Sequence, residues 1–130
     1  MLFRSQPALT VGLLSPVEHP ARGTIFPQPL LQNKDGHPVR MDEVYPAGWK
    51  VIFSKDAGAN CERAFAHHHL PHLQVAQLGV GPLIELENVL NNWFIKHAVV
   101  AAIVRPDHYI YGVCADLESV AQQLNALKLV

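Results

Sequence analysis

The sequence predicts an α/β fold in which a proline-rich extended N-terminal arm precedes a mixed four-stranded sheet with helices on both faces. Seven of the ten prolines lie within the first 48 residues, and each proline removes an amide donor and disfavours helix at the preceding residue. After residue 48, short apolar runs alternate with stretches whose apolar residues recur every three or four positions. These patterns indicate buried strands and amphipathic helices. The chain is 49% hydrophobic and 16% charged, which favours a packed core over a disordered chain.

Residues 1–48 are expected to form an extended arm with turns, packed on a core formed by residues 49–130, so that the chain is one structural domain overall. The segment Asn33–Gly36 predicts a reverse turn, because asparagine, aspartate and glycine tolerate the positive φ that such turns require. Short edge strands are expected on either side of this turn. The density of prolines predicts no regular helix in the arm.

The core is expected to begin with a buried strand at Val51–Phe53, a β-branched and aromatic run bounded by polar residues. A helix is predicted over Ala59–Leu70, where Asn60 is a candidate N-cap and Pro71 ends the segment. A second strand is predicted at Leu73–Leu78, before a break rich in glycine.

The strongest helix signal follows this break, because apolar residues and one histidine recur there at spacings of three and four. These residues are Leu83, Leu86, Leu90, Trp93, Phe94 and His97. Glu85 and Glu87 are expected in the first turn of this helix, where negative charge is favoured.

The remaining chain predicts a hairpin and a final helix. Ala98–Val104 is apolar without alternation, as in a central strand covered on both faces. Arg105–His108 is expected to turn the chain, since proline supplies the φ that the second position of a turn requires, and Tyr109–Cys114 is expected to return antiparallel. Asp116 is expected to cap a last helix. The inner face of that helix would be Leu117, Val120, Ala121, Leu124 and Leu127.

The order of elements after the arm is therefore strand, helix, strand, helix, strand, strand, helix (βαβαββα). Crossover connections between strands of one sheet are almost always right-handed, so the first two strands are expected to pair in parallel. The hairpin then adds antiparallel strands to the same sheet. This is a thioredoxin-like arrangement.

Charge and hydropathy exclude several classes of partner. Ten basic and eleven acidic side chains give a net charge of −1, so we expect no binding to nucleic acid or to an anionic membrane. The longest apolar run, Ala98–Val104, has seven residues, whereas a membrane helix needs about 20. The N-terminus lacks a basic segment followed by an apolar run of signal-peptide length, which favours a cytoplasmic location.

A thioredoxin-like fold raises the hypothesis of thiol chemistry at the start of the first core helix, where a CxxC pair uses the helix N-terminus to lower a thiol pKa. Only Cys61 is present there, and Cys114 lies 53 positions further on. The cis-proline that faces such a site has no candidate, because Ala98 stands at the expected start of the first hairpin strand. Free buried thiols are therefore expected, with a reactive Cys61 as the alternative.

The histidine-rich segment 67–72 raises a second hypothesis, that of a metal site. His68 and His72 have the i, i+4 spacing that places two imidazoles on one helical face. Pro71 interrupts that face, and no carboxylate or cysteine clusters beside it. We expect an exposed helix end and no specific metal site, with His68 and His72 as the candidate ligands of the alternative.

Other motifs of catalysis or cofactor binding are absent from the sequence. The chain has no GxSxG nucleophile elbow, and neither of the phosphate-binding loops GxGxxG and GxxxxGKS/T. Asp42, Glu43, Glu85 and Glu87 are expected to be surface charges. We therefore expect no catalytic and no cofactor-binding residue in this chain, and no enzymatic activity from the isolated chain.

Four blocks of sequence are distinctive in their order and spacing. They are Gly23–Pro29, then Asp35–Gly36 with Arg40–Val44, then Trp49–Phe53, and finally Val104–Val113. Together they resemble the C-terminal, thioredoxin-like domain of FAD-dependent aromatic-ring hydroxylases, the group that includes 3-(3-hydroxyphenyl)propionate hydroxylase and phenol 2-monooxygenase. The positions that carry this structural motif are Gly23, Pro27, Gly36, Arg105, Pro106 and Asp107.

This resemblance implies a domain appended to a flavoprotein monooxygenase. In that family a longer N-terminal portion binds FAD and the phenolic substrate and takes electrons from NAD(P)H, while the appended domain has lost the redox cysteines and serves packing and subunit contacts. The implied partner is this flavin-binding portion, in the same polypeptide or as a partner subunit, and a homodimer through the arm is a further arrangement. Two readings of the chain stay open, a fragment of a longer hydroxylase and a short gene product. A stand-alone thioredoxin-fold protein with a reactive Cys61 or a histidine metal site is the alternative.

Within the hairpin, Arg105 and Asp107 flank the proline of a tight turn. Their side chains are expected to pair with each other or with the arm, and so to fix where the arm lies. The alternative is a plain surface turn, because exposed ion pairs usually contribute less than about 1 kcal/mol.

Overall fold

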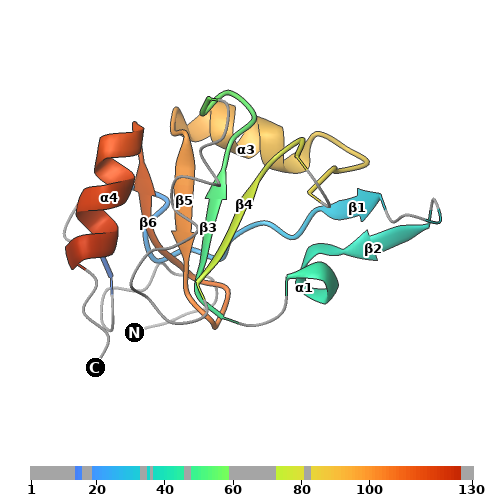
Figure 1. Cartoon of the computed structure of the whole chain (residues 1–130), viewed down its shortest axis with the longest axis horizontal. Coiled ribbons are helices and arrows are strands. Elements are labelled where there is room, and N and C mark those ends of the chain that lie inside the picture. The colour runs from blue at the N-terminus through green and yellow to red at the C-terminus, as the bar shows by residue number, and fades with distance from the viewer. Residues whose placement is uncertain are drawn as a thin grey trace.

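The computed structural model describes residues 14–15, 19–32, 35, 37–45, 48–58, 73–80 and 83–126. Within these ranges a four-stranded sheet with the order β4-β3-β5-β6 forms the centre of the molecule (Figure 1). Its strands are β3 (Lys50–Phe53), β4 (Gln74–Gln77), β5 (Ala101–Val104) and β6 (Ile110–Cys114). A separate two-stranded sheet is formed by β1 (Leu30–Gln32) and β2 (Pro38–Arg40).

The strand pairing confirms the predicted topology. Strand β3 pairs in parallel with β4 and antiparallel with β5, and β5 pairs antiparallel with β6. The predicted edge strands on either side of the arm's turn are also present as β1 and β2. The helix predicted over Ala59–Leu70, with Asn60 and Pro71 at its ends, lies outside the described residues. The described part of the chain has the mixed sheet of a thioredoxin-like fold.

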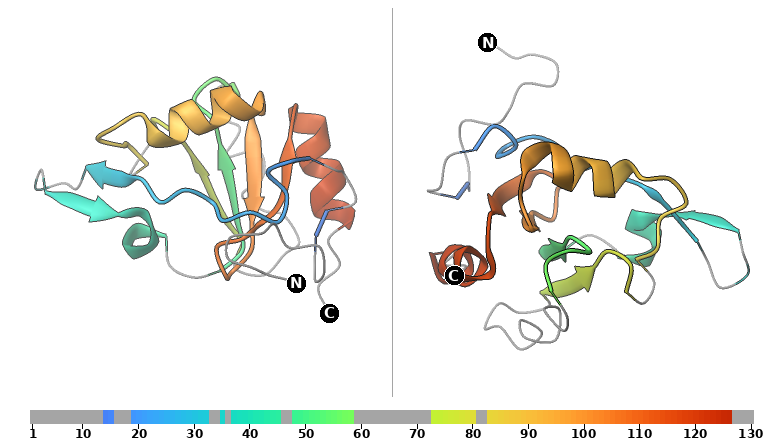
Figure 2. Two further views of the ribbon diagram at one scale, coloured as in Figure 1. Left: turned by 180° about the vertical axis from the view of Figure 1, so that it is seen from behind. Right: turned by 90° about the horizontal axis from the view of Figure 1, so that it is seen from above.

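Helices cover both faces of this sheet, as predicted. Figure 2 shows α3 (Val89–His97) on one side and α4 (Leu117–Ala126) on the other. Side chains of a strand point alternately to opposite faces, so the core is divided into two apolar clusters. One contains Ile52 of β3 with Leu90 and Phe94 of α3, and the other contains Val51 and Phe53 of β3 with Val120 and Leu124 of α4.

The arm lies on the same face of the sheet as α3. Its buried side chains Ala21, Phe26, Leu31 and Met41 belong to the cluster that contains Ile52. In the left view of Figure 2 the arm runs across the sheet, from the side of α4 to β1. The arm is therefore part of the hydrophobic core on this face.

One short helix lies within the arm, where none was expected. Helix α1 spans Met41–Val44, between the prolines at positions 38 and 46. No proline falls inside that interval, so one helical turn meets no steric obstacle. The carboxylate of Glu43 accepts a hydrogen bond from the backbone N–H of Arg40 (3.0 Å) and so stabilises the start of the turn.

Helix α3 begins later than its apolar spacing predicted. Leu83 is buried but not helical, and the segment 84–86 is extended, with a β-bridge between Glu85 and Leu31 of β1. The carboxylate of Glu85 accepts hydrogen bonds from the backbone N–H groups of Leu90 (2.8 Å) and Asn91 (2.9 Å). Glu85 and Glu87 therefore precede the helix rather than lying in its first turn, and Leu86 is exposed. Pairing with a distant strand outweighed the local helical spacing.

Two further boundaries differ from the prediction. Ala98 has a left-handed φ of 54° and ends α3, so β5 begins only at Ala101. Leu117 stands exposed at the start of α4 rather than on its inner face. The predicted cap of this helix is confirmed, because Asp116 Oδ1 accepts a hydrogen bond from the Ser119 N–H (2.8 Å). Among the described residues, no helix has the length and hydropathy needed to cross a membrane.

Candidate functional site

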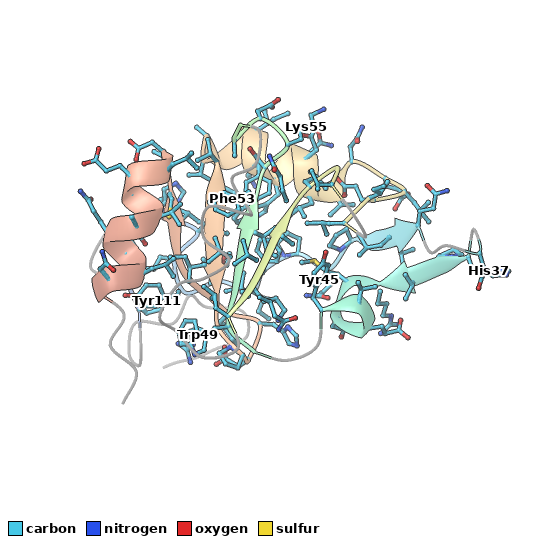
Figure 3. The ribbon with its side chains drawn as sticks, in the orientation of Figure 1. His37, Tyr45, Trp49, Phe53, Lys55 and Tyr111 are labelled. Atoms are coloured by element: carbon cyan, nitrogen blue, oxygen red, sulfur yellow. The ribbon has the colours of Figure 1, made fainter. Side chains whose placement is uncertain are left out.

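The loop after β3 occupies the position where a thiol enzyme of this fold would carry its cysteine pair. Its described residues, Ser54–Gly58, include no cysteine. The Ser54 N–H donates to the Val100 carbonyl (2.8 Å), and Gln77 Nε2 donates to the carbonyls of Ser54 (3.2 Å) and Gly58 (2.9 Å). Figure 3 shows Lys55 of this loop at one end of the sheet. Cys61 lies outside the described residues, so its reactivity stays a prediction.

Cys114 lies at this same end of the sheet, because it pairs with Ala101, which in turn pairs with Phe53. The side chain is fully buried and makes no disulfide. Burial raises the pKa of the Cys114 thiol to about 12. Because the thiolate is the form that attacks substrates and binds metals, Cys114 is the unreactive buried thiol that the sequence predicted.

The described residues contain no group of three or more side chains that could hold a metal ion. The candidate ligands His68 and His72 lie outside the described residues, so that hypothesis is not decided here.

The described glycine turn after β4 does not fit the pyrophosphate of FAD. Gly79 has a φ of 88°, but its N–H already donates to the Leu83 carbonyl (2.8 Å). The chain then continues as the extended segment 84–86. A dinucleotide-binding loop instead leads directly into a helix whose N-terminal N–H groups face the phosphates.

The turn between β5 and β6 is built from local polar contacts. Arg105 Nη2 and Asp107 Oδ2 form an ion pair (2.7 Å). Asp107 Oδ1 also accepts from the Tyr109 N–H (3.2 Å), and the Arg105 N–H donates to the Tyr109 carbonyl (2.8 Å). His108 completes the turn with a left-handed φ of 71°. Of the two pairings predicted for Arg105 and Asp107, the one within the turn is present.

The arm lies against the edge of this hairpin through backbone hydrogen bonds. The Gly23 N–H donates to the Ile110 carbonyl (2.8 Å), and the Ile110 N–H donates to the Thr24 carbonyl (2.8 Å). The Phe26 N–H donates to the His108 carbonyl (2.9 Å). Gly23 has a φ of 83°, a conformation that glycine adopts readily.

Among the motif positions, Gly23 therefore meets the start of β6, directly after the turn that holds Arg105, Pro106 and Asp107. Pro27 follows the last of these arm contacts along the chain. Gly36 lies outside the described residues. Gly23 and the turn of Arg105, Pro106 and Asp107 thus lie where the arm meets the hairpin, which we call the arm–hairpin junction (residues 23–26 and 105–110).

A second polar contact holds the arm closer to its N-terminal end. The Ser15 N–H donates to the Tyr111 carbonyl (2.9 Å), and the Ser15 hydroxyl donates to Gln123 Oε1 (2.7 Å). Gln123 Nε2 in turn donates to the Val113 carbonyl (2.8 Å). A side chain at Gly112 would overlap both Ser15 and Gln123.

Sequence reasoning missed this contact. Two signals for it exist, a glycine inside an apolar strand, which marks a close approach, and a glutamine next to the apolar stripe of α4. Figure 3 shows Tyr111 beside Trp49, at the end of β3 opposite to Lys55, and their rings meet edge to face at 5.8 Å.

Aromatic contacts join the arm to α3. The Trp93 ring contacts Phe26 of the arm (5.3 Å between centroids) and His97 (4.8 Å), and His97 contacts His19 of the arm (5.6 Å). Burial lowers the pKa of His97, and the neighbouring His19 and Lys96 lower it further. His97 therefore favours its neutral form against the arm.

The chain matches the model of the HcaD C-terminal domain family over residues 23–128. The match begins at the arm glycine that meets β6. The chain is also 28% identical, over 123 residues, to a probable NADH-specific resorcinol 4-hydroxylase from Rhodococcus jostii (strain RHA1). This alignment covers 88% of the chain and 22% of that protein.

Two solved structures share the fold. Aklavinone-11 hydroxylase, in a ternary complex with FAD and aklavinone, superposes with a TM-score of 0.58 at 18% identity, over 95% of this chain and 25% of its own. The flavin-dependent monooxygenase PieE, in complex with FAD and substrate, superposes with a TM-score of 0.52 at 18% identity. This superposition covers 79% of the present chain and 18% of PieE. The chain thus spans a quarter or less of the proteins that it matches. It belongs to the HcaD C-terminal domain family, the thioredoxin-like C-terminal domain of FAD-dependent aromatic-ring hydroxylases.

Proposed function

We propose that this chain acts as the non-catalytic accessory domain of an FAD-dependent aromatic-ring monooxygenase, for which it supplies packing and subunit contacts. The family match over residues 23–128 carries the proposal. One feature of the described residues supports it: the thiol of Cys114 is fully buried, and burial raises its pKa to about 12.

In this proposal the flavin-binding portion holds FAD, takes electrons from NAD(P)H in the cytoplasm and hydroxylates a phenolic ring. That portion is part of the same polypeptide or a partner subunit. FAD supplies the oxygen-activating chemistry there. The residues of the present chain act only by binding and positioning that portion.

We also propose that residues 1–48 and 49–130 act as a single structural unit. The buried Phe26 and Leu31 of the arm share an apolar cluster with Ile52 of the sheet. Loss of the arm would expose this cluster to water, so the domain requires the arm to fold.

The test compares the 130-residue chain alone with the chain mixed with the flavin-binding polypeptide that accompanies it, expressed separately if the two are fused. Alone, the chain should retain no FAD after gel filtration and should oxidise no NAD(P)H in the presence of resorcinol. Mixed, it should co-purify with the flavoprotein at equal stoichiometry and raise the temperature at which FAD is released, because a ligand of the folded state stabilises that state.

Two results would contradict this function. One is disulfide reductase activity of the isolated chain that disappears in Cys61→Ser. The other is an equivalent of bound metal that disappears when His68 and His72 are both replaced by alanine. Either result would support the stand-alone thiol or metal protein instead.

A further inference from the structure

A small apolar surface is formed where the segment 84–86 adds to β1. The two run antiparallel, since the Gln32 N–H donates to the Ile84 carbonyl (2.8 Å) and the Leu86 N–H donates to the Leu30 carbonyl (2.9 Å). Three large apolar side chains on this pair face the solvent. Leu30 is 43% exposed, Ile84 44% and Leu86 46%. We call these three side chains the outer β1 face.

The alternation of polar and apolar residues on the segment 84–86 is the reverse of that expected for an isolated domain. Side chains of a strand alternate between two faces, and here Leu31 and Glu85 take the inner face. Leu31 is fully buried in the core, and Glu85 binds the first N–H groups of α3. The contacts of Leu31 and Glu85 fix the register between β1 and the segment 84–86, so the side chains of Ile84 and Leu86 face the solvent. Adjacent exposed apolar side chains, unlike single ones, indicate an interaction site.

The edge of this surface is polar. Strand β2 places Arg40 opposite Leu30 and Pro38 opposite Gln32, and all four residues are exposed. Exposed charges of both signs lie at this edge, since Glu87 follows Leu86, and Asp42 and Glu43 follow Arg40. An apolar centre with a polar edge is the composition of a protein–protein interface. The complementary surface would be apolar at its centre and polar at its edge.

The outer β1 face also lies at one end of the molecule. Figure 1 shows β1 and β2 beyond β4, at the end opposite α4. The arm–hairpin junction and the Ser15 contact lie towards α4, so the outer β1 face is separate from the surfaces on which the arm is bound.

We propose that the outer β1 face docks the flavin-binding portion of the hydroxylase, and this rests on the function proposed above. The domain makes up 22% of the resorcinol hydroxylase relative and 25% of aklavinone-11 hydroxylase, so most of each relative lies outside it and is available to cover this face. A second copy of the chain is the other occupant, and the experiment below distinguishes it.

The experiment measures the dissociation constant between the 130-residue chain and the separately expressed flavin-binding polypeptide by calorimetry. The test variant carries Leu30→Thr and Leu86→Thr, because threonine keeps the strand preference while removing apolar area. Its affinity should fall about tenfold or more, since the two side chains lie at the centre of the proposed contact. The control is Ile95→Gln on α3, an apolar residue that is 64% exposed elsewhere, and it should bind within about twofold of the original chain.

Each outcome decides the assignment. If the original chain binds and the double variant binds equally, the outer β1 face is not the docking surface, although the proposed function stands. If the original chain does not bind the flavoprotein, both proposals fail. A wild-type homodimer that light scattering shows to dissociate in the double variant would make a second copy the occupant and overturn the proposal. Thermal unfolding of both variants verifies that each is folded, because all three replaced side chains are exposed.

Discussion

The two ends of the central sheet differ in the contacts that their loops make. At the end where β3 leads into Ser54–Gly58, the backbone of the loop is bound by Gln77 and Val100, and the cysteine nearby, Cys114, is buried and protonated. At the other end, the turn between β5 and β6 presents backbone groups that bind the arm. Among the described residues, the first end carries a bound loop and a buried thiol, whereas the opposite end binds the arm.

This difference supports the proposal that the domain acts by packing and subunit contacts. The described contacts at the loop end hold the loop Ser54–Gly58 against β4 and the start of β5. Those at the hairpin end join segments far apart in sequence, and they determine how the arm crosses the sheet.

Cys114 should resist alkylation in the folded protein. With a thiol pKa of about 12, its thiolate fraction at neutral pH is on the order of a thousandfold below that of an ordinary cysteine. Mass spectrometry of Cys61→Ser treated with iodoacetamide would measure the rate at Cys114 alone. Urea should restore the ordinary rate. A folded-state rate within tenfold of free cysteine would mean that this end of the sheet is open to reagents.

Phe26→Ala should lower the free energy of unfolding by about 3–5 kcal/mol, because it leaves a cavity in the cluster shared by the arm and α3. Ile25→Ala is the matched control, because the adjacent Ile25 side chain is 46% exposed. This substitution should lower the free energy of unfolding by less than about 0.5 kcal/mol. Urea denaturation would measure both. Equal effects at the two positions would show that the arm is not part of the core.

Gly112→Ala should lower the free energy of unfolding by about 1–3 kcal/mol, because the added methyl group overlaps Ser15 and Gln123. The cost should shrink in a background that already carries Gln123→Ala, which removes one of the overlapping groups. A double-mutant cycle measures this coupling. Strict additivity of the two changes would contradict the close approach of the arm to β6 and α4.

Stability should fall modestly as the pH drops from about 7.5 to about 5, in part through His97. Its folded-state pKa lies below the ordinary 6.5, mainly through burial and then through His19 and Lys96. The unfolded chain therefore binds a proton at this histidine more readily than the folded chain does. The contribution of neutral His97 to stability is fully present above pH 6.5 and is lost as the pH falls through the folded-state pKa. His97→Gln should flatten the unfolding free energy across this range. An unchanged slope would remove His97 as a cause.

Arg105→Ala should have the smallest effect, changing overall stability by less than about 1 kcal/mol. It breaks the ion pair with Asp107 that shapes the turn, so amide exchange over residues 23–30 should become faster, first at Gly23 and Phe26, whose N–H groups bind the hairpin. Pro106→Ala leaves the ion pair in place and serves as the control. Unchanged exchange in Arg105→Ala would show that the turn holds the arm without its ion pair.

The sheet and its topology could be predicted because each strand carries its own local signal. Val51–Phe53 and the Arg105–Asp107 turn need no distant partner to be recognised. The segment 84–86 could not be predicted in the same way, because Leu83, Leu86 and Leu90 have helical spacing and only β1, more than fifty residues earlier, makes the segment extended.

The same reason explains what was missed at the candidate site. The ion pair between Arg105 and Asp107 was predictable from two residues that flank a proline. The hydrogen bond from Ser15 to Gln123 joins residues 108 positions apart, and no spacing rule reaches that far. The position of the arm therefore required the structure, even though its extended character did not.

The arm's hydrogen bonds to Ile110 and Tyr111 have one further consequence. An edge strand such as β6, if its N–H and C=O groups are unpaired, can pair with strands of other chains and so promote aggregation. Here Ser15 and Gly23 occupy two of those carbonyls. A version of this chain that begins at residue 49 would lack these contacts and is expected to aggregate.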